Sequence, residues 1–160
     1  MPQSISEITL IRELKSIQKY SDVFSVGLNN NNIFEWDILI FGQENTIYEG
    51  TFLNGRMKFP KNFPNYPPNF QFTTKMFHPN IYEDGKVCLS ILHDPGEDKY
   101  EYESASERWR PVITVYSIIQ SIILILNQPN LDSPANIDAA IMYKEDENKY
   151  KKYIKNLLEN

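Results

Sequence analysis

The stretch FHPNIYEDGKVCLSILH, residues 77–93, contains the only cysteine of the chain and both of its histidines. A lone cysteine between apolar neighbours can be a small buried hydrophobe, but the residues before Cys88 favour a reactive thiol. Pro79 and Asp84-Gly85 are turn signals, and Asn80 places a side-chain amide between them. A cysteine that carries an acyl group needs a donor for the oxyanion, and this amide can be that donor. The stretch therefore predicts a thiol site in an irregular loop.

Length and composition indicate one ordinary domain. The chain has 160 residues, 41% of them apolar and 23% charged, so we expect a single core domain over residues 1–160. The net charge of −5 argues against a nucleic-acid binder, which needs a basic face. A single cysteine excludes an internal disulfide framework and a multi-thiolate zinc site and suits a reducing compartment. We expect no metal site.

No stretch of the sequence has the pattern of a leader peptide or a membrane anchor. The most apolar stretch, residues 118–126, is interrupted by Gln120 and Ser121 and is about half as long as a bilayer span requires. We therefore expect no membrane segment, and a protein of the cytoplasm or the nucleus.

The first half of the chain predicts a helix followed by four strands. Ser4 and Glu7 have the spacing of a capping box, and the apolar stripe expected behind them is Ile8, Ile11 and Leu14, with Leu10 and Ile17 as further members. Alternating apolar residues then predict strands around residues 24–28, 34–40, 51–59 and 70–72. The asparagine run 29–32 fits a hairpin turn.

The second half predicts an irregular region and then three helices. Thr114 is the expected N-cap of a strongly apolar helix that Pro129 stops, and Ser133-Pro134 predicts the cap and first turn of the next. The second of these helices should carry Ile137, Ala140 and Ile141, and the last Tyr150, Tyr153, Ile154, Leu157 and Leu158. The expected class is α+β: an N-terminal helix, a four-stranded antiparallel meander sheet, an irregular active-site region and three C-terminal helices.

Several motifs, in this order, resemble those of ubiquitin-conjugating enzymes, also called ubiquitin carrier proteins. The central one is His78-Pro79-Asn80, followed at this spacing by Cys88-Leu89. The others cover nearly the whole chain: Tyr48-Glu49-Gly50 before Phe52, the proline loop from Phe59-Pro60 to Tyr66-Pro67-Pro68, Trp109-Arg110-Pro111, Gln128-Pro129-Asn130 and Ser133-Pro134-Ala135-Asn136. On these motifs the chain is identified as a member of the family, whose fold we expect it to share.

The subgroup can be narrowed from one insertion. Cys88 and Trp109 lie 21 residues apart, farther than in plain members of the family. The extra segment, about residues 93–108, resembles the acidic insertion of a subgroup linked to the polyubiquitin chains that mark proteins for the proteasome. Charge runs are usually solvated loops, but this one begins just after the predicted nucleophile, so we expect it to have a function.

The resemblance implies a mechanism. Cys88 would accept ubiquitin from a ubiquitin-activating enzyme as a thioester and pass it to lysines of protein substrates or of ubiquitin, together with a ligase. The activating enzyme consumes the ATP, so no bound cofactor is expected. Asn80 would donate a hydrogen bond to the oxyanion, brace its loop, or do both, and His78 is assigned to loop structure. Members of the insertion subgroup work near the endoplasmic reticulum, which makes a peripheral location there an alternative.

Two departures from the family pattern affect the handling of the acceptor lysine. Ordinary members have an Asp where this chain has Ser133, and a hydroxyl cannot act as a carboxylate. We expect His93 or Asp98 of the insertion to take its place. Because the reference pKa of lysine is ~10.4, the site must desolvate the amine as well as attract it. Phe77 stands where many members have Tyr, which removes a hydroxyl near the site.

The expected partner surface also departs from the pattern. Asn65 stands in the proline loop where members usually place a hydrophobic contact for ligases of the RING type. The residues that remain for the activating enzyme and a RING-type ligase are Arg12, Lys15, Tyr66 and Pro111.

Three other functions stay open. The closest is conjugation of another ubiquitin-like modifier, because the core motif is common to those enzymes. A non-catalytic ubiquitin-binding scaffold is disfavoured, since inactive relatives lack the cysteine. A thiol hydrolase using Cys88, Asn80 and either His78 or His93 is disfavoured because no hydrolase signature surrounds Cys88, and its acidic neighbours would raise the thiol pKa.

Overall fold

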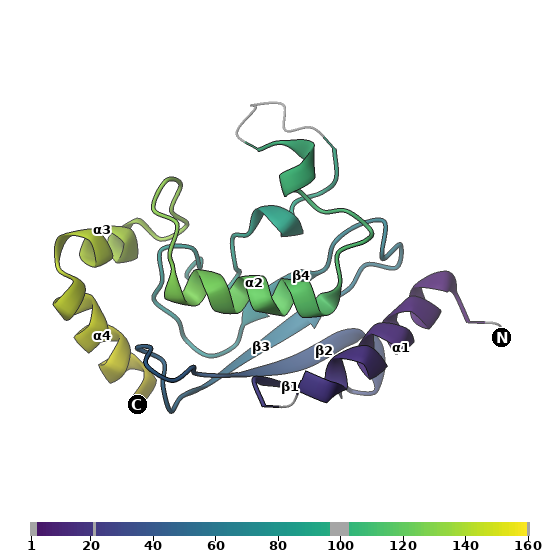
Figure 1. Cartoon of the computed structure of the whole chain (residues 1–160), viewed down its shortest axis with the longest axis horizontal. Helices are drawn as coiled ribbons and strands as arrows, with labels where there is room; N and C mark the ends of the chain where they lie inside the picture. The colour runs from purple at the N-terminus through teal and green to yellow at the C-terminus, as the bar shows by residue number, and fades with distance from the viewer. Residues whose placement is uncertain (1–2, 21, 97–102, 160) are drawn as a thin grey trace.

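The computed structural model describes residues 3–20, 22–96 and 103–159. Within these ranges the main elements are α1 (Ile5–Ile17), β1 (Phe24–Asn29), β2 (Asn32–Phe41), β3 (Phe52–Lys58), β4 (Asn69–Phe72), α2 (Val115–Asn127), α3 (Ile137–Glu145) and α4 (Glu147–Glu159). Short 3-10 turns accompany them: η1 (Gln18–Tyr20), η2 (Ser90–Leu92) and η3 (Ala105–Glu107). The predicted α+β architecture is confirmed (Figure 1).

The sheet is an antiparallel meander in the order of the chain, β1-β2-β3-β4. The asparagine run turns the first hairpin, where Asn30 and Asn31 have φ of 52° and 58°. Asparagine tolerates this left-handed backbone better than most residues. Alternate residues of β2 are buried, as the sequence pattern predicts for a strand with one face toward a core: Phe34, Trp36, Ile38 and Ile40.

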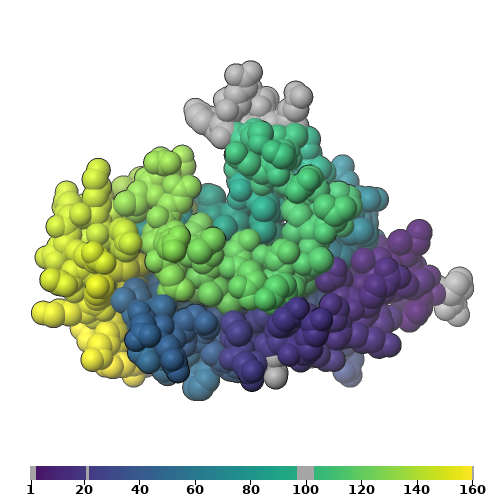
Figure 2. Space-filling model, viewed as in Figure 1, coloured from purple at the N-terminus to yellow at the C-terminus, as the bar shows by residue number. Residues whose placement is uncertain are grey.

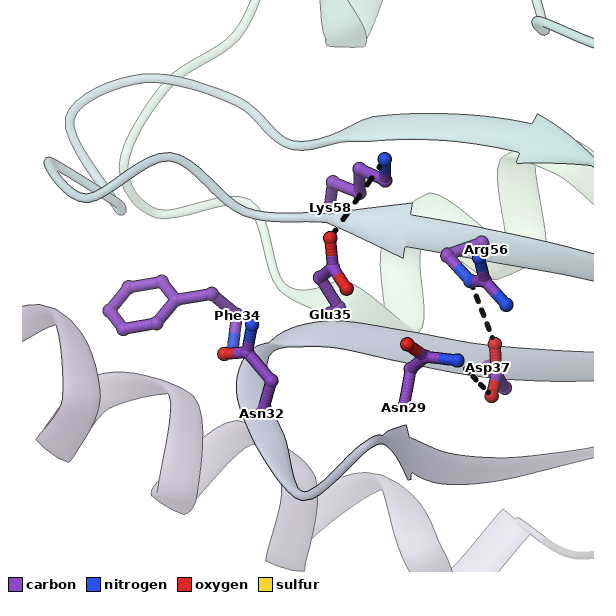
Figure 3. A network of polar contacts seen from close by, with 7 residues as sticks. All are labelled: Asn29, Asn32, Phe34, Glu35, Asp37, Arg56 and Lys58. Carbon is purple, nitrogen blue, oxygen red and sulfur yellow. Dashed lines mark hydrogen bonds and ion pairs between the residues drawn. The ribbon is translucent and has the colours of Figure 1, made fainter.

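The outer face of the sheet carries polar cross-strand pairs (Figure 3). Arg56 Nε lies 3.0 Å from Asp37 Oδ1, and the Asn29 amide donates to Asp37 Oδ2 at 3.1 Å. Lys58 of β3 and Glu35 of β2 form a looser pair, with 3.8 Å between Lys58 Nζ and Glu35 Oε1. Because these side chains are largely solvated, the pairs add little stability. This part of the outer face is therefore polar, whereas farther along the same two strands Phe41 and Phe52 pack edge to face and leave Phe52 66% exposed.

Helix α2 covers the inner face of the sheet (Figure 1). Thr114 caps it as predicted, accepting a hydrogen bond from the Ser117 N–H at 3.1 Å. The apolar side of α2 is buried in one cluster with the inward residues of the sheet, and its members are Val115, Ile118, Ile119, Ile122 and Leu126. In Figure 1, α1 lies at one end of this layer and α3 and α4 lie at the other. The irregular region, residues 73–114, connects β4 to α2, so both of its ends are attached to the core.

Helix α1 buries only part of the predicted stripe. Leu10 and Ile17 are buried as expected and Leu14 packs partly buried against the core, whereas Ile8 is 45% exposed and Ser6 is buried. The cause is a polar contact: the Ser6 hydroxyl lies 2.6 Å from the Lys61 carbonyl oxygen and 2.7 Å from that of Phe63. This contact turns the Ser6 side of the helix toward the proline loop. Hydrophobic periodicity could not reveal it.

Helix α3 begins three residues later than predicted, and Ser133 is not its cap. The cap is Asn136, whose side-chain oxygen accepts a hydrogen bond from the Ala139 N–H at 3.0 Å. The backbone N–H groups of Ala135 and Asn136 donate to the Pro79 carbonyl at 2.7 and 3.0 Å, which holds this stretch as a loop. Of the predicted apolar face only Ala140 is buried; Ile137 is 64% and Ile141 48% exposed, and Ala139 is buried as well.

Candidate active site

A groove of about 410 Å³ lies beside Cys88. Its walls come from the loop before the cysteine, the returning arm of the insertion and the loop between α2 and α3. They include Asn80, Cys88, Leu89, Ser90, His93, Glu103, Glu107, Ile125, Asn130, Asp132 and Ser133. Figure 2 shows a hollow here, between the raised segment that precedes α2 and the yellow-green loop that follows it. The fold thus brings Cys88, Asn80, His93 and Ser133 together, as the sequence analysis expects.

The thiol of Cys88 is half-buried and protonated at rest. Burial raises its pKa; a hydrogen bond with Tyr82 opposes this rise, and the negative charge of Glu103 adds to it. The backbone N–H of Cys88 donates to the Asn80 carbonyl at 2.9 Å, which fixes the position of the thiol relative to the preceding loop. A nucleophile of this kind depends on how its reaction partner is placed rather than on a resting thiolate.

Asn80 braces the site through its side-chain amide. Its Oδ1 accepts from the Asn130 N–H, and its Nδ2 donates to the Asn130 carbonyl, both at 2.8 Å. The side chain is almost fully buried. An amide nitrogen has two hydrogens, so the bond to Asn130 leaves one donor for an oxyanion. The bracing role and the oxyanion role are therefore compatible.

His78 lies beneath the groove and is fully buried. Its Nδ1 accepts from the Asn80 N–H at 2.9 Å, and its Nε2 lies 2.8 Å from the Ile125 carbonyl oxygen, to which it donates. These bonds use both ring nitrogens of a neutral imidazole. Burial lowers the pKa of His78 to about 4, so the ring stays neutral at physiological pH. His78 holds the loop and is not placed to move a proton.

His93 is part of a polar cluster at the base of the insertion. Its Nδ1 lies 2.9 Å from the Glu103 carboxylate, which is itself 3.7 Å from Arg108 Nη1. The sequence predicts His93 near Cys88 but neither of its partners, because the pairs join residues across the insertion. Asp98, the alternative to His93, lies outside the described residues.

The site contains two more residues, Asp132 and Tyr82, that were not predicted from the sequence. Asp132 lines the groove immediately before Ser133, so a carboxylate is present one residue away from the position where the family pattern expects it. Tyr82 is close enough to Cys88 for the cysteine charge to raise the tyrosine pKa, with burial as a smaller cause. Its signal in the sequence was a hydroxyl within the turn between Asn80 and Cys88.

The expected partner residues are exposed and lie on elements that contact one another. Arg12 and Lys15 are exposed on α1, as are Tyr66 in the proline loop and Pro111 before α2. Ser6 ties α1 to the proline loop, and Trp109 Nε1 donates to the Pro64 carbonyl at 2.8 Å, which ties that loop to the segment before α2. In the described ranges, no helix is both long and apolar enough to cross a membrane.

Comparison with known proteins agrees with this geometry. A family model described as ubiquitin-conjugating enzyme matches residues 9–158. Ubiquitin-conjugating enzyme E2 15 of Schizosaccharomyces pombe is 48% identical over 99% of this chain and 96% of its own length. Ubiquitin-conjugating enzyme E2 7 of Arabidopsis thaliana is 50% identical over 94% of this chain and 92% of its own.

A solved structure shares the fold as well. The crystal structure of a Plasmodium yoelii chain assigned as a ubiquitin conjugating enzyme superposes with a TM-score of 0.83, at 30% identity, over 99% of this chain and 96% of that one. Sequence, fold and groove therefore lead to one conclusion: the chain belongs to the ubiquitin-conjugating enzyme family, a class of transferases.

Proposed function

We propose that Cys88 accepts ubiquitin from an activating enzyme as a thioester and passes it to lysine amines of protein substrates or of ubiquitin, together with a RING-type ligase. The observation that carries the proposal is the groove itself, in which the only thiol of the chain shares a wall with the Asn80 amide. The activating enzyme uses the ATP, and this chain needs no cofactor of its own.

Two steps make up the reaction. The Cys88 sulfur first attacks the thioester carbonyl on the activating enzyme. A new C–S bond forms, the old C–S bond breaks, and the sulfur of the activating enzyme leaves and takes up the proton that Cys88 loses. A lysine amine then attacks the carbonyl carbon on Cys88, a C–N bond forms, and the Cys88 sulfur leaves. The first step exchanges one thioester for another and is nearly balanced in energy, so placement of the two sulfurs is the main requirement.

Asn80 serves both the loop and the transition state. Its bonds to the Asn130 backbone hold the amide in the wall of the groove that also contains Cys88, and its remaining N–H would donate to the oxyanion of the second step. Removing one such donor elsewhere slows acyl transfer by ~10²–10³-fold. A donor that is already held rigidly needs little reorganisation when the oxyanion forms.

Acidic side chains favour a lysine acceptor. Glu103, Glu107 and Asp132 line the groove, and carboxylates attract an ammonium group before it is desolvated and loses its proton. This charge, together with the acidic insertion, supports the further proposal that the enzyme builds polyubiquitin chains that direct proteins to the proteasome.

A hydrolase function has less support than transfer. Hydrolases of the papain kind use a thiolate paired with an imidazole. Here the Cys88 pKa is raised, and both ring nitrogens of His78 are engaged by the backbone. The side-chain hydrogen bond of the thiol is with Tyr82 and not with His93.

One incubation tests the proposal. The chain is mixed with activating enzyme, ATP and labelled ubiquitin and resolved on a non-reducing gel, with parallel lanes holding other ubiquitin-like modifiers and their own activating enzymes. We expect an adduct with ubiquitin that a thiol reductant removes, and no such adduct with Cys88→Ala. Loading with a different modifier in place of ubiquitin would overturn the assignment of ubiquitin, and no loading at all would refute the carrier function.

A further inference from the structure

The two arms of the insertion are fastened together beside the groove. Glu103 bridges His93 Nδ1 and Arg108 Nη1, and Arg108 Nε donates to the Asp94 carbonyl at 2.8 Å. The Trp109 backbone N–H donates to the His93 carbonyl at 3.1 Å. The side chains of Glu103 and Arg108 are each only 19% exposed. The imidazole of His93 is therefore held in one orientation from both its ring and its backbone.

This orientation determines which ring nitrogen can take part in chemistry. A carboxylate at Nδ1 favours a proton on that nitrogen and leaves the lone pair on Nε2. His93 lines the same groove as Cys88, and its side chain is 39% exposed, so an incoming group can reach it. In hydrolases, a carboxylate placed in this way fixes the tautomer of an imidazole and stabilises its charged form.

The transfer of ubiquitin to an amine has a proton to remove. When a neutral amine adds to the thioester carbon, a C–N bond forms and the carbonyl electron pair moves to the oxygen. The nitrogen then holds one proton too many and a positive charge. Unless this proton leaves, expulsion of the amine competes with expulsion of the Cys88 sulfur, and the step reverses.

We propose that His93 Nε2 accepts this proton, that Glu103 stabilises the imidazolium so formed, and that Arg108 is a positioning residue that holds Glu103. The oxyanion pair then re-forms the carbonyl, the C–S bond breaks and its electron pair leaves on the Cys88 sulfur. The imidazolium proton passes to that thiolate or to water. This inference rests on the proposed function, because it requires a thioester on Cys88.

Other charged groups near His93 make it possible to test proton transfer separately from electrostatic attraction of the lysine ammonium. Besides Glu103 and Arg108, Glu107 of η3 and Asp132 of the α2–α3 loop face the groove, and Asp94 follows His93 in the chain. Carboxylates, with reference pKa values of about 4, attract an ammonium but are poor proton acceptors at neutral pH. Asp132→Asn is therefore the matched control, since it removes one groove charge and leaves the imidazole and its partners intact.

The test is a single-turnover chase. Enzyme carrying ubiquitin on Cys88 is isolated and mixed with free lysine between about pH 5 and pH 8, and loss of the thioester is followed for wild type, His93→Gln, Glu103→Gln and Asp132→Asn. Deprotonation of lysine makes every rate rise with pH, so the informative quantity is the ratio of the wild-type rate to each variant rate. Thermal unfolding midpoints show whether each variant is folded.

For His93→Gln we expect a rate about 10²-fold below wild type at the upper end of this range, the lower bound for a general base. For Glu103→Gln we expect a smaller loss, because Nε2 remains while the imidazolium has lost its carboxylate partner. For Asp132→Asn we expect the smallest loss of the three, because the imidazole and its partners are intact.

A second chase, with N-acetylcysteine, isolates the proton step. An attacking thiolate brings no proton, so wild type and His93→Gln should discharge to this thiol at equal rates. Discharge of His93→Gln to lysine at the wild-type rate, or equal slowing toward lysine and thiol, would overturn the proposal. If His93→Gln does not fold, discharge of Glu103→Gln to lysine at the wild-type rate overturns it. Failure of Cys88 to carry ubiquitin refutes the proposed function instead, because there is then no thioester to chase.

Discussion

The buried neutral imidazole of His78 makes the stability of the fold depend on pH. In the unfolded chain this histidine binds a proton near pH 6.5, whereas in the folded state burial lowers its pKa to about 4. As the pH falls between these values the unfolded state gains a proton that the folded state cannot accept, so the free energy of unfolding falls. The loss ends below the folded pKa, where both states are protonated.

The magnitude follows from the two pKa values. Each pH unit between them costs up to about 1.4 kcal/mol, so the full loss from pH 6.5 to pH 4 is about 3 kcal/mol. This is a large share of the roughly 5–15 kcal/mol by which a domain is stable. Glu13 works in the opposite direction, because burial raises the pKa of its carboxyl group and protonation at low pH then favours the folded state.

The assay is urea unfolding at a series of pH values, followed by the fluorescence of the buried Trp36 and Trp109. Wild type is compared with His78→Gln, whose amide can still donate to the Ile125 carbonyl but does not titrate. The difference between the two proteins cancels the contribution of Glu13. We expect the variant to lose about 3 kcal/mol less than wild type between pH 7 and pH 4. Identical pH profiles for wild type and His78→Gln would refute the reasoning.

Three further predictions concern the chemistry at Cys88. Cys88→Ser should trap ubiquitin as an oxyester that resists thiols, or fail to load; thiol-sensitive loading of this variant would contradict the nucleophile assignment, because the chain has no other cysteine. Asn80→Ala leaves the Asn130 backbone without two hydrogen bonds. Unfolding experiments should therefore show a loss of ~1–3 kcal/mol in the free energy of unfolding, and single-turnover discharge to lysine should slow by ~10²-fold or more. If stability and loading fall together while the thioester that does form discharges at the wild-type rate, only the bracing role remains. Neutralising the acidic insertion at Glu97, Asp98, Glu101 and Glu103 should leave loading intact and slow chain formation with a cognate ligase. Attraction that acts through solvent is screened over ~8 Å at physiological ionic strength, so the wild-type advantage should shrink with salt. Chain formation at the wild-type rate at low salt would show that the insertion is only a solvated loop. Of the four positions, Glu103 lies in the described residues.

The regular elements could be predicted because local patterns decide them. Alternation along β2 and the uninterrupted apolar side of α2 each require burial on one face, and no competing contact opposes them. The two errors, at α1 and α3, have a common physical reason. In both places a polar contact with a distant loop overrides the local pattern: Ser6 with the Phe63 carbonyl, and the Asn136 backbone with the Pro79 carbonyl.

The candidate site was predictable in its residues more than in its contacts. The spacing of Asn80 and Cys88 places both at one loop, so their proximity follows from the sequence. The partner of the Asn80 amide is 50 positions away, at Asn130, and that of His93 is across the insertion, at Glu103. Periodicity and turn signals carry no information about such pairs, because they depend on how finished elements pack.

The single thiol also gives the protein one site for selective chemical labelling. Any reagent that alkylates thiols marks one atom, Cys88 Sγ, without removal of other cysteines first. Since alkylation requires the thiolate and the pKa of this thiol is raised, labelling should be slow at neutral pH and should speed up about tenfold per pH unit until the thiol titrates. A fluorophore attached there would sit in the groove, where its emission would register an acceptor, a ligase or a ubiquitin molecule as each one arrives.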